Sequence, residues 1–91
     1  MYLRGKNRIF YKSNTVGNKI VEIDILNSKL ERTNKLPMTF FNDNTYYIDI
    51  WFRNIGSYLF RVFENGIKKH EDILVVSAGN HIIYPDVERL I

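Results

Sequence analysis

The residue types that could carry acid–base or metal chemistry gather at one place in the chain. His70, Glu71 and Asp72 directly follow Lys68 and Lys69. Imidazole and carboxylate groups act as general acids and bases and also ligate metal ions. Neighbouring residues of a strand point to opposite faces, however, so only His70 and Asp72 would share a side. Two such groups fall short of a catalytic zinc site, and we interpret the cluster as a rim of solvated charges.

No other catalytic pattern stands out. The sequence has no G-x-S-x-G, no H-E-x-x-H and no phosphate-binding loop. Its four serines lie in or beside turn-rich segments, and cysteine is absent. Without cysteine, neither a disulfide framework nor a cysteine-based zinc site can form. We therefore predict a protein that is not an enzyme and that uses no cofactor or metal.

Basic residues interleaved with aromatic residues suggest a different chemistry, the binding of nucleic acid. The net charge is +3, and residues 1–35 hold eight Lys/Arg against three Asp/Glu, giving +5 there. Aromatic platforms beside cations hold single-stranded nucleic acid on small barrels, and each stacked base contributes roughly 1–3 kcal/mol. One interpretation is therefore an OB-like module for single-stranded nucleic acid. Its candidate contacts are Arg4, Lys6, Arg8, Lys12 and Trp51.

The elements that would position these side chains are short strands. Between residues 45 and 66, two segments of alternating apolar residues each end in a turn that contains glycine. Such alternation is typical of half-buried strands, and no segment sustains the 3.6-residue period of a helix. Asn65-Gly66 is a strong signal for a tight hairpin, and residues 42–44 form a turn by composition. Strands are predicted at 6–12, 19–26, 36–41, 45–52, 58–63, 67–76 and 81–84, with a bulge near Glu71-Asp72.

About seven short strands separated by turns predict an all-β protein. The expected architecture is a small antiparallel sandwich, and a partly barrel-like form is the alternative. The 91 residues fit one domain, with residues 1–5 and 86–91 as arms or tails. The row of Lys and Arg along 6–12 favours an edge strand there. No window reaches the ~18–20 apolar residues that a membrane span requires, so no membrane partner is predicted.

A longer pattern in the middle of the chain resembles a known class of module. Tyr46-Tyr47-Ile48-Asp49 is followed by G-x-Y-x-F-x-V-x-E-x-G from Gly56 to Gly66, and then by the branched residues 73–76. This pattern resembles the immunoglobulin-like β-sandwich modules of bacterial surface proteins and tailed-bacteriophage virion proteins. The chain lacks the Cys…Trp…Cys set of antibody domains. The resemblance implies a location in the virion and a role in capsid decoration, as a connector or adaptor, or in the tail. The absence of cysteine also fits the cytoplasm, which is the alternative location.

Apolar residues on both sides of neighbouring strands give the leading functional hypothesis. We expect Tyr58 and Phe60 of one strand to face the core, and likewise Ile73 and Val75 of the next. The residues that alternate with them then face outward. The outward residues are then Leu59, Phe63, Leu74 and Val76. Burying such a patch would contribute several kcal/mol at ~25 cal/mol per Å², so a monomer rarely leaves it exposed. We therefore predict a structural subunit that contacts other protein subunits, including further copies of itself.

Overall fold

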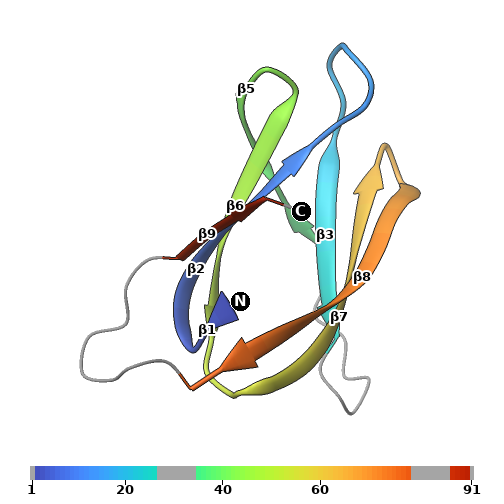
Figure 1. Cartoon of the computed structure of the whole chain (residues 1–91). Coiled ribbons are helices and arrows are strands. Elements are labelled where there is room, and N and C mark those ends of the chain that lie inside the picture. The colour runs from blue at the N-terminus through green and yellow to red at the C-terminus, as the bar shows by residue number, and fades with distance from the viewer. Residues whose placement is uncertain (1, 27–34, 79–86, 91) are drawn as a thin grey trace.

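Strands dominate the part of the chain that the computed structural model describes, residues 2–26, 35–78 and 87–90. Within these ranges lie nine strands (Figure 1): β1 (Tyr2–Leu3), β2 (Gly5–Lys12), β3 (Val21–Leu26), β4 (Leu36–Pro37), β5 (Thr39–Asn42), β6 (Thr45–Phe52), β7 (Gly56–Glu64), β8 (Ile67–Ser77) and β9 (Val87–Leu90). Six of the seven predicted strands lie in the described residues, and all six are present, the one predicted at 36–41 as β4 and β5. The described residues contain no helix, and hence none that could cross a membrane.

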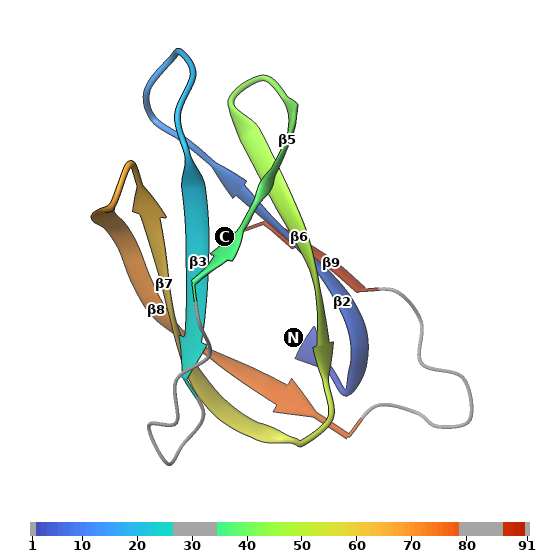
Figure 2. The same ribbon diagram turned by 180° about the vertical axis from the view of Figure 1, so that it is seen from behind.

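The strands form two sheets on opposite sides of one interior. One sheet has the order β1-β8-β7-β3-β4 and the other the order β5-β6-β2-β9. Neighbouring strands are antiparallel, except that β1 is parallel to β8 and β9 is parallel to β2. Figures 1 and 2 show β2 and β6 in one layer and β3, β7 and β8 in the other. The predicted all-β sandwich is confirmed, and the described strands do not close into a barrel.

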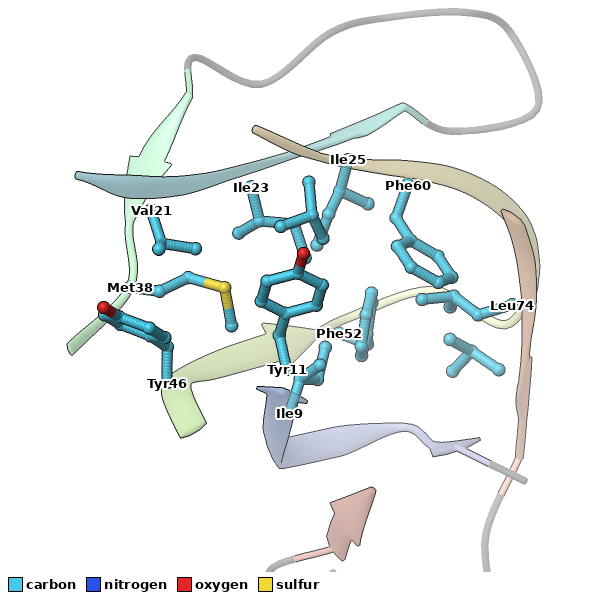
Figure 3. Packing of buried hydrophobic residues seen from close by; sticks show 12 residues of the cluster. Ile9, Tyr11, Val21, Ile23, Ile25, Met38, Tyr46, Phe52, Phe60 and Leu74 are labelled. Atoms are coloured by element: carbon cyan, nitrogen blue, oxygen red, sulfur yellow. The ribbon is translucent and has the colours of Figure 1, made fainter. Parts of the chain in front are cut away.

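The core fills the space between the two sheets, where alternate residues of each strand meet (Figure 3). β-Branched and aromatic side chains predominate, because they pack well on a pleated surface. The buried cluster consists of Ile9, Tyr11, Val21, Ile23, Ile25, Met38, Tyr46, Phe52, Phe60, Val62, Leu74 and Val76. The inward residues of both sheets thus leave the alternate residues of β2, β6, β7 and β8 on the two outer faces.

Two of the predicted turns have the backbone that tight hairpins require. Asn65 and Gly66 both have positive φ, at 50° and 82°, between β7 and β8. Asp43 and Asn44, between β5 and β6, also have positive φ, at 45° and 62°. Type I′ hairpin turns need positive φ at both central positions, which Asn, Asp and Gly tolerate best. Both turn predictions are confirmed.

The predicted orientation of β8 is wrong. Leu74 and Val76 are buried in the core, with exposed fractions of 4% and 2%, whereas Ile73 and Val75 are 64% and 55% exposed. The pairing explains this, because cross-strand partners share a face and Leu74 lies opposite Tyr58, which packs against the core. All four residues 73–76 are apolar, so their own pattern could not show which pair faces inward.

The bulge in this hairpin also differs from the prediction. Phe63 pairs with Lys68 and Val62 pairs with His70, so Lys69 is the extra residue of β8. The predicted position, Glu71-Asp72, is regularly paired instead. A bulge breaks the alternation of sides, and its position depends on the partner strand as much as on its own sequence.

Both chain ends depart from the predicted arms. β1 adds to β8 at one end of the chain, and β9 adds to β2 at the other. Unpaired backbone groups at the border of a sheet readily accept a short strand, whatever its side chains. β2 is consequently an inner strand between β6 and β9, not the predicted edge strand. The strand predicted at 81–84 lies outside the described residues.

Candidate binding surfaces on the outer faces

The residues that first suggested acid–base chemistry do not form a site. The ring of His70 packs against Phe60, with 5.6 Å between ring centroids. Glu71 accepts a hydrogen bond from the Lys68 ammonium at 3.0 Å, and Asp72 accepts one from the backbone N–H of Ile73 at 2.8 Å. Within the described residues, no three His, Cys, Asp or Glu side chains are placed to share a metal ion.

The outer face of the β5-β6-β2-β9 sheet brings most of the predicted nucleic-acid contacts together. β2 and β6 pair over their full length, so that Lys6 lies opposite Trp51 and Arg8 opposite Asp49. Outward residues alternate along both strands, which puts all of them on one surface. We call this surface the aromatic–basic face; it consists of Lys6, Arg8, Phe10, Lys12, Phe41, Tyr47, Asp49 and Trp51.

An ion pair occupies the middle of the aromatic–basic face. Arg8 donates to both carboxylate oxygens of Asp49, from Nε at 2.8 Å and from Nη2 at 3.1 Å. The hydrogen bond from Arg8 is the main reason why the pKa of Asp49 is lowered, with smaller contributions from the charges of Arg8 and Lys6. The same guanidinium lies over the ring of Tyr47, 4.6 Å from its centroid. Arg8 is thus oriented by two neighbours and neutralises the carboxylate beside it.

Aromatic rings lie on either side of this ion pair. Trp51 is 61% exposed and, with Lys6, Asp49 and Ile50, lines a shallow depression. Further along β2, Phe10 and Phe41 pack edge to face, with 5.6 Å between centroids. Phe41 lies on this face because strand residues alternate: Phe40 pairs with Tyr46, which faces the core, so Phe41 points to the outer side. Sequence reasoning did not single out Phe41, although the alternation of Leu36, Met38 and Phe40 leaves it on the opposite side.

Arg4 differs from the other predicted contacts. It precedes β2, and its backbone N–H donates to the carbonyl of Ser77 at 2.8 Å, at the border of the other sheet. The structure therefore places Lys6, Arg8, Lys12 and Trp51 on one face, with Arg4 beyond the end of the strand.

The outer face of the other sheet is apolar at one end and charged in the middle. Leu59 pairs with Ile73, and Ser57 with Val75, which puts these side chains outside. We call Leu59, Ile73 and Val75 the β7–β8 patch. Leu59 and Phe63 are partly buried rather than fully exposed. Of the four predicted interface residues, these two remain on the outer face, and Leu74 and Val76 do not.

Beside this patch lies a buried ion pair. Arg61 of β7 donates to both carboxylate oxygens of Asp24 in β3, at 3.0 Å and 2.6 Å. The hydrogen bond to Asp24 raises the pKa of Arg61 above its ordinary value. Asp24 is on the outer face, as its alternation predicts, but only 1% of it is exposed. Phe63 lies next to this pair, with the ammonium of Lys35 3.9 Å from its ring centroid.

A polar network closes the end of the sandwich between β2 and β7. The hydroxyl of Tyr11 donates to Glu64 at 2.6 Å. The ammonium of Lys19 donates to the hydroxyl of Ser13 at 2.7 Å and to the carbonyl of Thr15 at 2.6 Å. A serine beside a lysine is also a nucleophile–base arrangement. Ser13 is only 3% exposed, however, so the network holds the 13–20 loop against β7 and offers a substrate no access.

Comparison with known proteins defines the fold and goes no further. No protein family and no curated protein matches the chain. A solved structure from Bacteroides vulgatus, described as a putative glycoside hydrolase, is similar, with a TM-score of 0.65 and 14% sequence identity. The match covers 87% of this chain and 16% of that protein. At this identity the similarity shows a shared β-sandwich architecture. It does not assign the activity of that protein to this chain.

Proposed function

We propose that the chain is a non-enzymatic structural subunit of a larger assembly, acting through protein–protein contacts on the outer side of β7 and β8. The observation that carries this proposal is the exposure of Ile73 and Val75, which lie beside Leu59 on one face. Fully burying one such side chain contributes about 1.5–3 kcal/mol. Arg61 and Glu71, which pair next to the patch and are both accessible to solvent, supply the polar rim that protein interfaces carry around an apolar centre.

The border of β8 supports the same location. β1 pairs with β8 only at Val76 and Ser77, so residues 67–75 have no strand on that side among the described segments. In both ribbon views the first half of β8 forms the border of the molecule (Figures 1 and 2). An open border offers backbone donors and acceptors to a further strand.

The charges along this border favour a second copy of the chain as the added strand. β8 runs from Lys68-Lys69 to Glu71-Asp72 within five residues. In an antiparallel pair of two copies, the basic half of each β8 would lie beside the acidic half of the other, as a two-fold interface requires. Opposite charges facing each other across strands contribute roughly 0.2–1 kcal/mol per pair. Lysines and a bulge discourage unrelated strands from pairing, so the border would be selective for its own copy.

The resemblance to immunoglobulin-like modules supports a more specific setting. Such modules occur in tailed-bacteriophage virion proteins, and the sandwich agrees with the fold that the resemblance implies. We propose a virion component that decorates the capsid, connects its parts or forms part of the tail. In such a component, the β7–β8 patch would be buried against a neighbouring subunit.

Replacing Ile73 by glutamate is expected to weaken self-association by roughly tenfold or more with little loss of stability, because the side chain is exposed in the single chain. Light scattering coupled to size exclusion, from about 1 μM to 1 mM, measures this change. Ile20→Glu is the matched control, since Ile20 is 66% exposed in the loop before β3. A wild-type chain that stays monomeric throughout, or equal effects of the two variants, would contradict the proposed interface.

A charge exchange identifies the partner. Lys68→Glu with Lys69→Glu is expected to weaken self-association, because acidic groups then face acidic groups. Adding Glu71→Lys and Asp72→Lys to the same chain restores complementarity and is expected to restore association. A fourfold variant that fails to regain self-association, while Ile73→Glu still weakens it, would support the β7–β8 patch as an interface. The same result would exclude pairing between two β8 strands.

A further inference from the structure

The aromatic–basic face lies on the sheet opposite the proposed subunit interface, so the two surfaces do not overlap. Its outward rows follow one another along β2 and β6: Lys6 with Trp51, Arg8 with Asp49, Phe10 with Tyr47, and Lys12 with Thr45. Rows are two residues apart, about 6.8 Å along an antiparallel strand. Two aromatic positions are thus spaced along the face, with cations at both ends.

The charge of this face is positive where a ligand would lie. On β2 and β6, Lys6, Arg8 and Lys12 supply three positive charges and Asp49 supplies one negative charge, leaving +2. The register also places Glu88 of β9 opposite Arg8. Because Arg8 binds both oxygens of Asp49, that carboxylate does not oppose an approaching anion with a full charge. Lys6 and Lys12 lie at the two ends of the row, about 20 Å apart at about 3.4 Å per residue. This separation suits an elongated polyanion better than a single phosphate group.

The rings favour a ligand with exposed flat faces. Trp51 is 61% exposed and Phe41 is 53% exposed. The ring of Tyr47 is covered by Arg8, so Trp51 and Phe41 are the open platforms. Bases of a single strand can stack on such rings, whereas the bases of a duplex are already stacked on each other. A four-stranded sheet that carries aromatic residues on its surface is a known platform for single-stranded RNA.

From this arrangement we propose that the aromatic–basic face binds single-stranded nucleic acid, with Trp51 and Phe41 stacking on bases and Lys6 and Lys12 contacting phosphates. Recognition of this kind depends on the backbone charge and on stacking, and is tolerant of base sequence. The ion pair between Arg8 and Asp49 would hold the Arg8 guanidinium in place between the aromatic side chains on either side of it.

The only tryptophan of the chain lies in the proposed site, so its intrinsic fluorescence reports on binding directly. Titration with a thymidine oligonucleotide of about twelve nucleotides is expected to quench Trp51. The logarithm of the binding constant should fall with the logarithm of salt concentration, with a slope of about −0.7 per phosphate contact. Two lysine contacts therefore predict a slope of about −1.4.

Variants separate the proposed site from general attraction to a basic protein. Lys6→Ala is expected to reduce the slope by about 0.7, and Phe41→Ala to weaken binding roughly 5- to 150-fold without changing the slope. Lys35→Ala removes the same charge from the opposite sheet, where Lys35 lies over the ring of Phe63, and serves as the control. Trp51→Ala is followed by the anisotropy of a labelled oligonucleotide, and circular dichroism verifies that each variant is folded.

Three outcomes would overturn the inference. The first is the absence of quenching at low salt. The second is an effect of Lys35→Ala equal to that of Lys6→Ala, which would mean attraction to net charge alone. The third is quenching of Trp51 by a neutral oligosaccharide, independent of salt, with none by the oligonucleotide, which would assign the face to glycans. Oligonucleotide binding with the expected slope supports the inference whether or not the chain self-associates.

Discussion

Replacing Arg61 by alanine is expected to lower the free energy of unfolding by about 3 kcal/mol, because it removes the guanidinium that binds the buried carboxylate of Asp24. Asp24 is 1% exposed and the side chain of Arg61 is 21% exposed. A buried charge that loses its partner is far less stable than the same charge in water. Urea denaturation with linear extrapolation measures the loss.

The chain contains a matched control on its other sheet. Arg8 binds Asp49 with the same two-bond geometry, but both side chains of that pair are 34% exposed. Arg8→Ala is therefore expected to cost no more than about 1 kcal/mol, since water solvates the carboxylate that remains. Equal losses in the two variants would show that burial of Asp24 does not determine the energy of its ion pair.

A second comparison separates the effect of removing the whole Asp24–Arg61 ion pair from the effect of removing Arg61 alone. The double variant Asp24→Leu with Arg61→Met removes both charges and fills similar volumes with apolar groups. It is expected to be clearly more stable than Arg61→Ala, because it leaves no buried carboxylate behind. A double variant as unstable as the single one would show that the loss in Arg61→Ala does not come from an unpaired buried carboxylate.

The fold class follows from local patterns that long-range contacts did not override. The alternation of residues 45–52 predicted β6 with its observed ends, and Asn65-Gly66 predicted the β7–β8 turn. Period-two alternation and tight-turn dipeptides are properties of neighbouring residues, so a single sequence carries them. The placement of Lys6, Arg8 and Lys12 on one face follows from the same alternation.

What the sequence could not supply depends on pairing between distant strands. Residues 73–76 are apolar on both sides, so only their register with β7 decides that Leu74 faces the core. The neighbours that Phe41 meets on the aromatic–basic face, Phe10 and Tyr47, also depend on the pairing of β5 with β6 and of β6 with β2. Asp24 alternates like an exposed residue, and its burial could not be read from its neighbours. Register is a long-range property, and a shift of one residue exchanges the two faces of a strand.

Glutamine in place of Glu64 is expected to cost about 2 kcal/mol at neutral pH, and this cost is expected to shrink in acid. Burial alone would raise the pKa of Glu64, but hydrogen bonds from Tyr11, Ser13 and Thr15 and the charge of Lys19 outweigh it, so the pKa is lowered. Hydrogen bonds to a charged group contribute about 1.5–3 kcal/mol. A carboxyl group with a lowered pKa stabilises the fold above its unfolded pKa, and this contribution disappears as pH falls through the folded value.

The measurement is the difference in unfolding free energy between wild type and Glu64→Gln from pH 7 to pH 3. The other carboxyl groups titrate in both chains, so their effects on stability largely cancel in this difference. The difference should be constant above the ordinary glutamate pKa of 4.5 and should decrease below it. A difference that stays constant down to pH 3 would contradict the lowered pKa of Glu64.

Tyr11→Phe tests the same contact from its other side. Burial is the main reason why the pKa of Tyr11 is raised above 10.0, and its hydrogen bond to Glu64 and the charge of Glu64 raise it further. The neutral phenol therefore stabilises the fold below about pH 10, and this stability is lost as pH rises toward the folded value. The variant should lose stability at neutral pH and differ less from wild type in alkali.

Combining the two substitutions measures how strongly the residues are coupled. The cost of Glu64→Gln is expected to be smaller in a chain that already carries Tyr11→Phe than in the wild-type chain, since the two residues share one hydrogen bond. The four unfolding free energies at neutral pH, from the wild type, both single variants and the double variant, give this coupling directly. Additive losses would show that the 2.6 Å contact does not couple β2 to the end of β7.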